Sequence, residues 1–243
     1  MNLSCIPNGI SMMNLFMGVF SIIRIGEGRF DEALWLIVLA LICDSLDGNV
    51  ARIFKTSSEL GKELDSLGDI VSFVVAPALL ILRSWPYPLT LWMYAIVFFY
   101  LGAGAYRLAR YNINTSPTIQ GYFSGLPTPA TAIIIVTTSM GIEKAGMANN
   151  LPMTIAYFSW IALLGFLMIS HVSYPKITVV RFQEWKWLFV IGLVFFVAAY
   201  KTLSLEFAVA VPFILFVLFG FFSSLVSVPA ADDDASLKVI EEV

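Results

Sequence analysis

Long apolar runs fill this chain, and they restrict its fold more than any other feature of the sequence. A helix needs about 20 consecutive apolar residues to cross the hydrocarbon core of a bilayer. Of the 243 residues, 59% are hydrophobic and only 13% are charged, whereas a soluble domain carries roughly 25% charged residues. The sequence therefore predicts an all-α, polytopic membrane helical bundle.

Gly, Pro, Asn and charged residues interrupt the apolar runs, and these breaks predict about eight transmembrane helices. We expect the helices at residues 8–26, 32–54, 62–82, 87–110, 124–143, 151–171, 185–201 and 204–227. On this basis we divide the chain into a core of helices (1–143), additional transmembrane helices that complete the bundle (144–229) and an acidic disordered tail (230–243).

The distribution of Lys and Arg predicts the orientation in the membrane. With eight helices both termini lie on one side, which then holds nine Lys and Arg residues, against five on the other side. The positive-inside rule makes the richer side cytoplasmic. We therefore expect a multi-pass protein with both termini at the cytoplasmic face. The net charge of −3, without a basic tract, gives no indication of a nucleic-acid partner.

Four aspartates lie in or beside the second and third predicted helices, where a carboxylate is costly. At the bilayer centre each one costs about 2.5–3.5 kcal/mol. Asp44 and Asp47 share one face of the second helix, and Asp65 and Asp69 share one face of the third. Two antiparallel helices can direct both pairs towards one point. Oxygen ligands without His or Cys are typical of a site for a hard cation such as Mg²⁺ or Mn²⁺.

Three simpler interpretations compete with a metal site. A turn at Gly48 would explain only two of the four aspartates. A calcium-binding loop would need Glu at its twelfth position, where Lys55 stands. The third alternative is a set of structural ion pairs with Arg52, Lys55 and Lys62.

Small residues beside the carboxylates favour a bulky anionic ligand over these alternatives. Gly48, Ala51 and Gly61 leave room for a ligand to approach the backbone. Arg52 and Lys55, together with a metal, would neutralise the charge of a diphosphate.

The same stretch resembles the signature of the CDP-alcohol phosphotransferase family, D-x-x-D-G-x-x-A-R-x(8)-G-x-x-x-D-x-x-x-D. The eight fixed positions are filled by Asp44, Asp47, Gly48, Ala51, Arg52, Gly61, Asp65 and Asp69. Members of that family transfer a substituted phosphate from a CDP-linked lipid or alcohol to a hydroxyl group and release CMP. The resemblance implies a metal-dependent transferase that binds one or two divalent ions, with residues 1–143 as its catalytic core.

The resemblance also implies roles for individual residues. Asp44, Asp47 and Asp65 would bind the metal, and Asp69 would be a further ligand or the general base. The residues expected to bind the CDP group and its phosphates are Asn8, Gly48, Ala51, Arg52, Lys55 and Gly61. An N-cap at the start of the first helix is an alternative role for Asn8.

Other segments resemble the phosphatidylserine synthase branch of this family and suggest the acceptor. The stretches are "IPNGISMMNLFMG" (6–18), "ELDSLGDIVSFVVAPALL" (63–80), "YRLARYNI" (106–113) and "GYFSGLPTPATA" (121–132). One departure is Val74, where the branch would have glycine. The implied substrates are CDP-diacylglycerol and L-serine, and a homodimer is expected by the same resemblance.

Serine is a zwitterion, so its carboxylate needs a cation. Arg107 and Arg110, at the cytoplasmic end of the fourth helix, are the best candidates, and Ser124 lies in a loop expected to line the cavity. Anchoring of the arginines at the membrane surface and a plain turn at the loop are the alternatives. Other acceptors in the family are glycerol phosphate, inositol phosphate and choline. A divalent-cation transporter is the alternative from another class.

Overall fold

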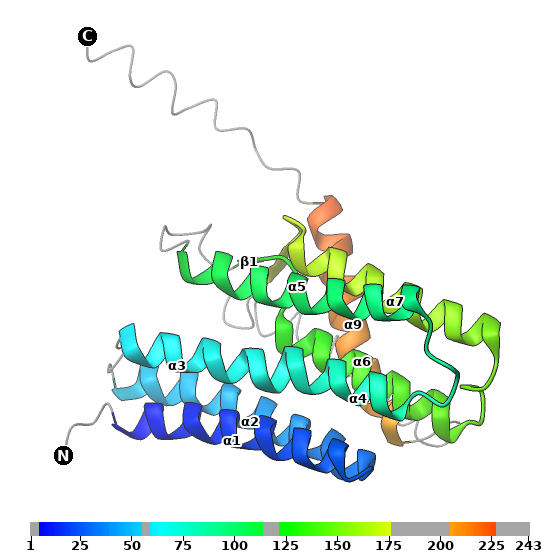
Figure 1. Cartoon of the computed structure of the whole chain (residues 1–243). Coiled ribbons are helices and arrows are strands. Elements are labelled where there is room, and N and C mark those ends of the chain that lie inside the picture. Colours follow the sequence, from blue (N-terminus) through cyan, green and yellow to red (C-terminus); the bar gives the residue numbers. More distant parts are fainter. Residues whose placement is uncertain (1–4, 55–58, 114–121, 176–204, 227–243) are drawn as a thin grey trace.

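Long helices account for most of the chain in the computed structural model, which describes residues 5–54, 59–113, 122–175 and 205–226 (Figure 1). An all-α fold is confirmed, apart from one short ribbon. Helices suit such apolar segments because a helix satisfies its own backbone groups where no water is available. The helices are α1 (Cys5–Gly26), α2 (Phe30–Phe54), α3 (Glu59–Ile70), α4 (Ala76–Ser84), α5 (Leu91–Ile113), α6 (Thr128–Lys144), α7 (Leu151–Ile169) and α9 (Leu205–Val226).

Four segments are long and apolar enough to cross a membrane, which supports an integral membrane protein. They are Pro7–Gly26, Glu59–Ser84, Leu91–Ile113 and Leu151–Ile169. The predicted number of eight spans is not confirmed. The predicted seventh helix (185–201) and the acidic tail (230–243) lie outside the described residues.

Helices α3 and α4 form one continuous path that contains a π-helical turn, η1 (Val71–Val75). Pro77 follows this turn in the first turn of α4 and has no N–H to offer the carbonyl of Phe73. The hydroxyl of Tyr100, from α5, donates a hydrogen bond of 2.6 Å to that carbonyl instead. The irregular turn thus begins two residues after Asp69, and a neighbouring helix satisfies the backbone group that the proline leaves unpaired.

A two-stranded antiparallel ribbon is the one element that the sequence did not predict. Strand β1 (Tyr122–Ser124) pairs with β2 (Ser173–Pro175), so that Phe123 lies opposite Tyr174. The ribbon joins the segment before α6 to the segment after α7. It therefore fixes the start of α6 relative to the end of α7.

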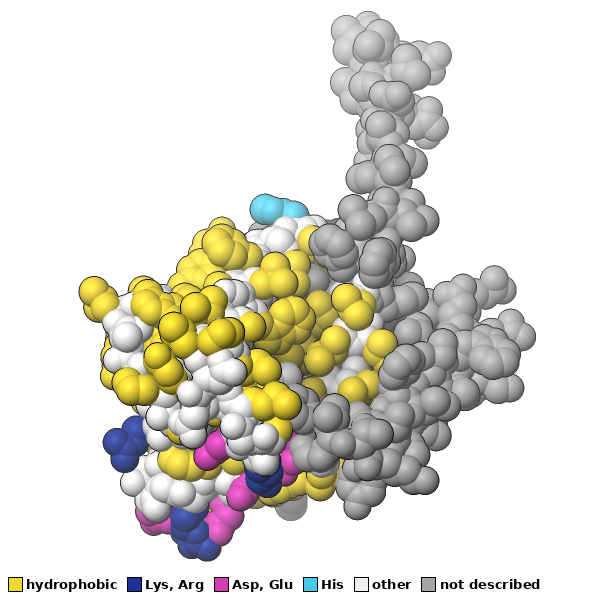
Figure 2. Space-filling model, turned by 90° about the vertical axis from the view of Figure 1, so that its right-hand side faces the viewer, with side chains coloured by type: hydrophobic (Ala, Val, Ile, Leu, Met, Phe, Trp, Pro, Cys, Tyr) yellow, Lys and Arg dark blue, Asp and Glu magenta, His cyan; other side chains and the backbone are white. Residues whose placement is uncertain are grey.

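Ion pairs occupy the turn between α1 and α2, at the end of α2 opposite Asp44 and Asp47. Arg24 pairs with Glu27 at 2.7 Å and with Glu32 at 3.3 Å, and Arg29 also pairs with Glu32. Figure 2 shows this end of the molecule: charged side chains gather along its lower part, and hydrophobic side chains cover most of the remaining described surface. This separation of charged and apolar surface is typical of a helix end at a membrane boundary.

Candidate active site

Three of the four predicted carboxylates converge between α2 and α3. Asp44, Asp47 and Asp65 each offer one oxygen, and these oxygens lie within 4.8 Å of one another. Asp44 and Asp47 are three residues apart in α2 and therefore share a face. Helix α3 brings Asp65 to the same point. The helical spacing in the sequence predicts that both pairs of aspartates meet at one point, and the structure brings three of the four together.

The cluster has the chemistry of a cation site. The carboxyl groups of Asp44 and Asp65 contact each other directly, and Oδ1 of Asp65 is buried without a hydrogen-bond donor among the described residues. Carboxylates in such proximity repel one another unless a cation or a proton lies between them. Three oxygen ligands without sulfur or imidazole fit a hard divalent ion. The arrangement could therefore bind a metal.

Asp69 lies beside this group but is not one of its three members. Its side chain is buried at the end of α3, one turn beyond Asp65. The amide of Asn14, from α1, donates a hydrogen bond of 3.1 Å to Oδ1 of Asp69. The fourth aspartate is therefore held separately from the other three.

Helix α1 supports the acidic cluster with residues to which the sequence reasoning gave no role. Ser11 donates a hydrogen bond of 2.7 Å to Oδ2 of Asp47, and Asn14 contacts Asp69 as described. Ser21 continues the same helix face and donates to the carbonyl of Ala33. All three side chains are buried. Polar residues at positions 11, 14 and 21 of an otherwise apolar helix are the signal that could have identified this face.

The residues expected to bind CDP are only partly described. Gly48 is exposed in α2, and a Cβ atom placed there would meet no described atom within 4 Å, which is consistent with room for a ligand. Gly61 is half-buried in α3. The side chains of Ala51 and Arg52, and all of Lys55, lie outside the described residues. Asn8 lies three residues inside α1, so the alternative that it is the N-cap is wrong.

A cavity of about 480 Å³ opens beside the carboxylates and contains the first of the two arginines. Asp44, Asp65, Asp69 and Arg107 line it. The Arg107 side chain is only 7% exposed, and it donates a hydrogen bond of 2.6 Å to Oγ1 of Thr128 at the start of α6. Its Nε is buried and has no acceptor among the described residues. One buried cation with an unused donor therefore lies in the same cavity as the acidic cluster.

Arg110 is directed elsewhere, towards the end of α7. Its Nη1 donates to the carbonyl of Ile169 at 2.7 Å, and its Nη2 donates to the carbonyl of Ser170 at 3.2 Å. These carbonyls have no partner within the helix, so Arg110 caps the C-terminus of α7. The structure thus separates two arginines that the sequence placed together.

The loop from β1 to α6 forms a wall of the cavity. Ser124 ends β1, and its side chain is outside the described set. Gly125 has a φ of +81° and donates its N–H to the carbonyl of Val172. Pro127 and Pro129 then line the cavity. The irregular backbone here is held by hydrogen bonds to the α7–β2 segment.

Taken together, the apolar helical bundle and the partly buried carboxylate cluster define a membrane protein with an acidic site that could bind a metal. The model of the CDP-alcohol phosphatidyltransferase family matches residues 4–164, and the chain belongs to that family.

Several curated relatives carry more specific names. The chain is 36% identical over 192 residues to a CDP-diacylglycerol–serine O-phosphatidyltransferase from Helicobacter pylori, with 78% of each chain covered. An enzyme of the same name from Methanocaldococcus jannaschii is 38% identical over 171 residues, which cover 70% of this chain and 74% of the relative. An archaetidylserine synthase from Methanothermobacter thermautotrophicus is 35% identical over 185 residues, with 71% and 70% covered.

Proposed function

We propose that this protein is a phosphatidylserine synthase, which transfers the phosphatidyl group of CDP-diacylglycerol to the hydroxyl of L-serine and releases CMP. The observation that carries the proposal is the convergence of Asp44, Asp47 and Asp65 within 4.8 Å, next to a cavity that contains Asp69 and Arg107. Family membership supplies the CDP-linked donor. The names of the similar bacterial and archaeal enzymes support serine as the acceptor.

Asp44, Asp47 and Asp65 would hold Mg²⁺ or Mn²⁺. When bound, the ion would withdraw charge from the diphosphate and stabilise CMP as the leaving group. The arrangement of three carboxylate oxygens supports this assignment, since hard divalent ions prefer oxygen ligands.

Asp69 would act as the general base. Its separation from the compact group of three carboxylates favours this role over direct metal binding. Asn14 holds Oδ1 of Asp69, which leaves Oδ2 to take the proton from the serine hydroxyl. The serine oxygen then forms a bond to the phosphorus, and the anhydride bond between that phosphorus and CMP breaks, with the electron pair leaving on CMP.

Arg107 would bind the carboxylate of serine. The buried Nε without an acceptor supports this role, because a buried donor that lacks a partner is costly until a ligand supplies one. Arg110 would have an indirect role, because it holds the carbonyls at the end of α7. We further propose that the active site faces the cytoplasm, with both termini on that side, and that the enzyme is a homodimer.

The direct test is a panel of acceptors. Purified protein in detergent with CDP-diacylglycerol and Mg²⁺ or Mn²⁺ is given serine, glycerol phosphate, inositol phosphate or choline, and the release of CMP is measured. We expect release with serine and none after chelation of the metal. Release with glycerol phosphate but not with serine would assign a different acceptor within the same family. Metal uptake into vesicles without CMP release would instead favour the transporter.

A further inference from the structure

Helix α9 lies outside the residues matched by the family model, yet it forms part of the cavity. The family match ends at residue 164, whereas α9 spans Leu205–Val226. Pro212, Phe213 and Phe216 line the same cavity as the aspartates. Part of the cavity wall therefore comes from an element outside the family match.

The side of the cavity formed by α9 is entirely apolar. Phe213 and Phe216 are half-buried, and Pro212 is exposed on the same helix. Leu41 of α2 and Ala130 of α6 continue this apolar lining. A zwitterion such as serine would lose its hydration there without gaining a polar partner. This apolar side of the cavity is therefore suited to bind a hydrocarbon group.

The direction in which the cavity extends supports the same conclusion. On α2 the lining residues are Leu41, Asp44 and Ser45, whereas Gly48, one turn beyond Asp44, is not among them. The cavity therefore extends from the carboxylates towards the middle of α2. The small residues expected to face the nucleotide lie on the other side of the carboxylates, nearer the end of the helix. The phosphates of the donor would lie between the two regions.

We propose that α9 forms the binding wall for the lipid part of the donor, and that Phe213 and Phe216 contact the acylglycerol of CDP-diacylglycerol next to the phosphate. This inference rests on the proposed function for the identity of the donor. It assigns a substrate-binding role to the last described helix.

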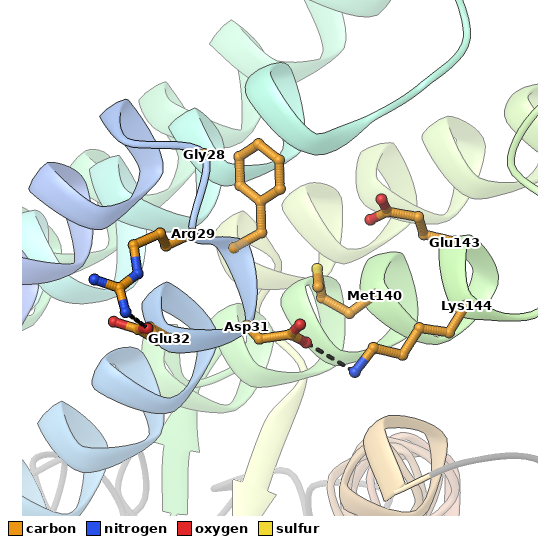
Figure 3. Close-up of a pocket in the computed structure, with 8 residues that line it drawn as sticks. Gly28, Arg29, Asp31, Glu32, Met140, Glu143 and Lys144 are labelled. Carbon is orange, nitrogen blue, oxygen red and sulfur yellow. Dashed lines mark ion pairs between the residues drawn. The ribbon is translucent and has the colours of Figure 1, made fainter.

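An ion triad at the opposite end of the bundle holds α9 in this position. Nζ of Lys144, the last residue of α6, lies 2.6 Å from Glu206 and 2.8 Å from Asp31 of α2. Figure 3 shows Lys144 and Asp31 directed towards each other across the gap between their helices. Glu206 is buried in the first turn of α9. Phe213 follows it by two turns of helix, about 10 Å along the axis, so the triad positions the wall.

The test measures binding of the donor without any acceptor. Wild-type protein, a Phe213→Ala/Phe216→Ala double variant and a Leu218→Ala control are titrated with CDP-diacylglycerol and, separately, with CDP. Leu218 belongs to the same helix but is 45% exposed and does not line the cavity. We expect the double variant to bind CDP-diacylglycerol at least tenfold more weakly, because it removes apolar contact area. Binding of CDP should change less than twofold, and the control should resemble the wild type.

Two outcomes would overturn the inference. One is wild-type affinity of the double variant for CDP-diacylglycerol; the other is an equal loss of affinity for CDP, which would place the nucleotide at this wall. A Phe213→Leu/Phe216→Leu variant guards against misfolding, since it keeps apolar side chains and should recover most of the affinity. If wild-type protein binds CDP-diacylglycerol but does not use serine, the assignment of serine as the acceptor is wrong. The binding measurements then still decide whether α9 binds the lipid part of the donor.

Discussion

The amide of Asn14 donates a hydrogen bond of 3.1 Å to the carboxylate of Asp69, although 55 positions separate the two residues in the chain. Both side chains are buried. The contact fixes which oxygen of Asp69 remains available to an acceptor. Asn14 is therefore a positioning residue in the proposed mechanism, because it acts through Asp69.

We expect Asn14→Ala to lower kcat about 10- to 100-fold, the range seen when a residue that orients an active-site ligand is removed. The KM for CDP-diacylglycerol should change little, because Asn14 does not line the cavity. Ser21→Ala is the matched control, since Ser21 is also buried in α1 but bonds to the carbonyl of Ala33. Equal losses of activity in both variants would show that Asn14 is only structural.

Gly125→Ala should destabilise the protein much more than Gly146→Ala. Both glycines have positive φ, +81° and +70°, a conformation that costs a side chain about 1 kcal/mol. At Gly125 the added Cβ would also lie 2.3 Å from the carbonyl oxygen of Met168, whereas at Gly146 it would meet nothing described within 4 Å. Thermal unfolding in detergent measures the difference. Similar melting temperatures for the two variants would contradict the close approach of the loop to α7.

Tyr100→Phe should lower the free energy of unfolding by about 1–3 kcal/mol, because it leaves the buried carbonyl of Phe73 without a donor. Tyr94→Phe, at an exposed position of the same helix, is the control. Adding Pro77→Ala should recover part of the loss, since alanine restores a backbone N–H. If the changes in the free energy of unfolding caused by the two substitutions are strictly additive, Tyr100 does not compensate for the proline.

Lys144→Met should destabilise the protein in a manner that depends on pH. Lys144 lies just after the predicted span 124–143. Hydrogen bonds to Asp31 and Glu206 raise its pKa above the ordinary value of 10.5. A raised pKa means that the stabilisation is complete below pH 10.5 and is lost as the pH rises through the higher, folded-state value. The melting temperatures of the variant and wild type should differ at neutral pH and converge above that value. Convergence already at neutral pH would contradict the triad.

The sequence could predict the helices and the acidic cluster because both depend on local spacing. Apolar runs of sufficient length predict α1 at 8–26, close to the observed Cys5–Gly26, and the separation of Asp44 from Asp47 places both on one face. The contact between Asn14 and Asp69 could not be predicted in this way. It depends on how α1 packs against α3, which local periodicity does not specify.

The separate partners of the two arginines of α5 could not be predicted from local spacing either. Arg107 and Arg110 are three residues apart, so the helical period gives them neighbouring positions. Their different partners come from α6 and α7, which place Thr128 beside one and the last carbonyls of α7 beside the other. Only the tertiary fold assigns one arginine to the cavity and the other to a helix end.

Val74 shows how a departure from the family pattern can be accommodated. Its side chain is buried against Gly104 of α5, where an added Cβ would lie 2.7 Å from Cγ2 of Val74. The glycine on the facing helix therefore provides the space that the valine fills. The sequence identified Val74 as unusual, but the compensating residue lies 30 positions away and is found only from the packing.

Incorporation of labelled serine into lipid is the most direct test of whether this protein is a phosphatidylserine synthase. Wild-type protein, Asp69→Asn and Asp65→Asn are incubated with CDP-diacylglycerol, labelled serine and a titration of Mg²⁺ or Mn²⁺. We expect one labelled phosphatidylserine per CMP released by the wild type, and no turnover at any metal concentration for Asp69→Asn. Asp65→Asn should need at least tenfold more metal, because it loses a proposed ligand. Metal-independent incorporation would contradict the proposed metal site, and near-normal turnover by Asp69→Asn would contradict the role of Asp69 as the general base.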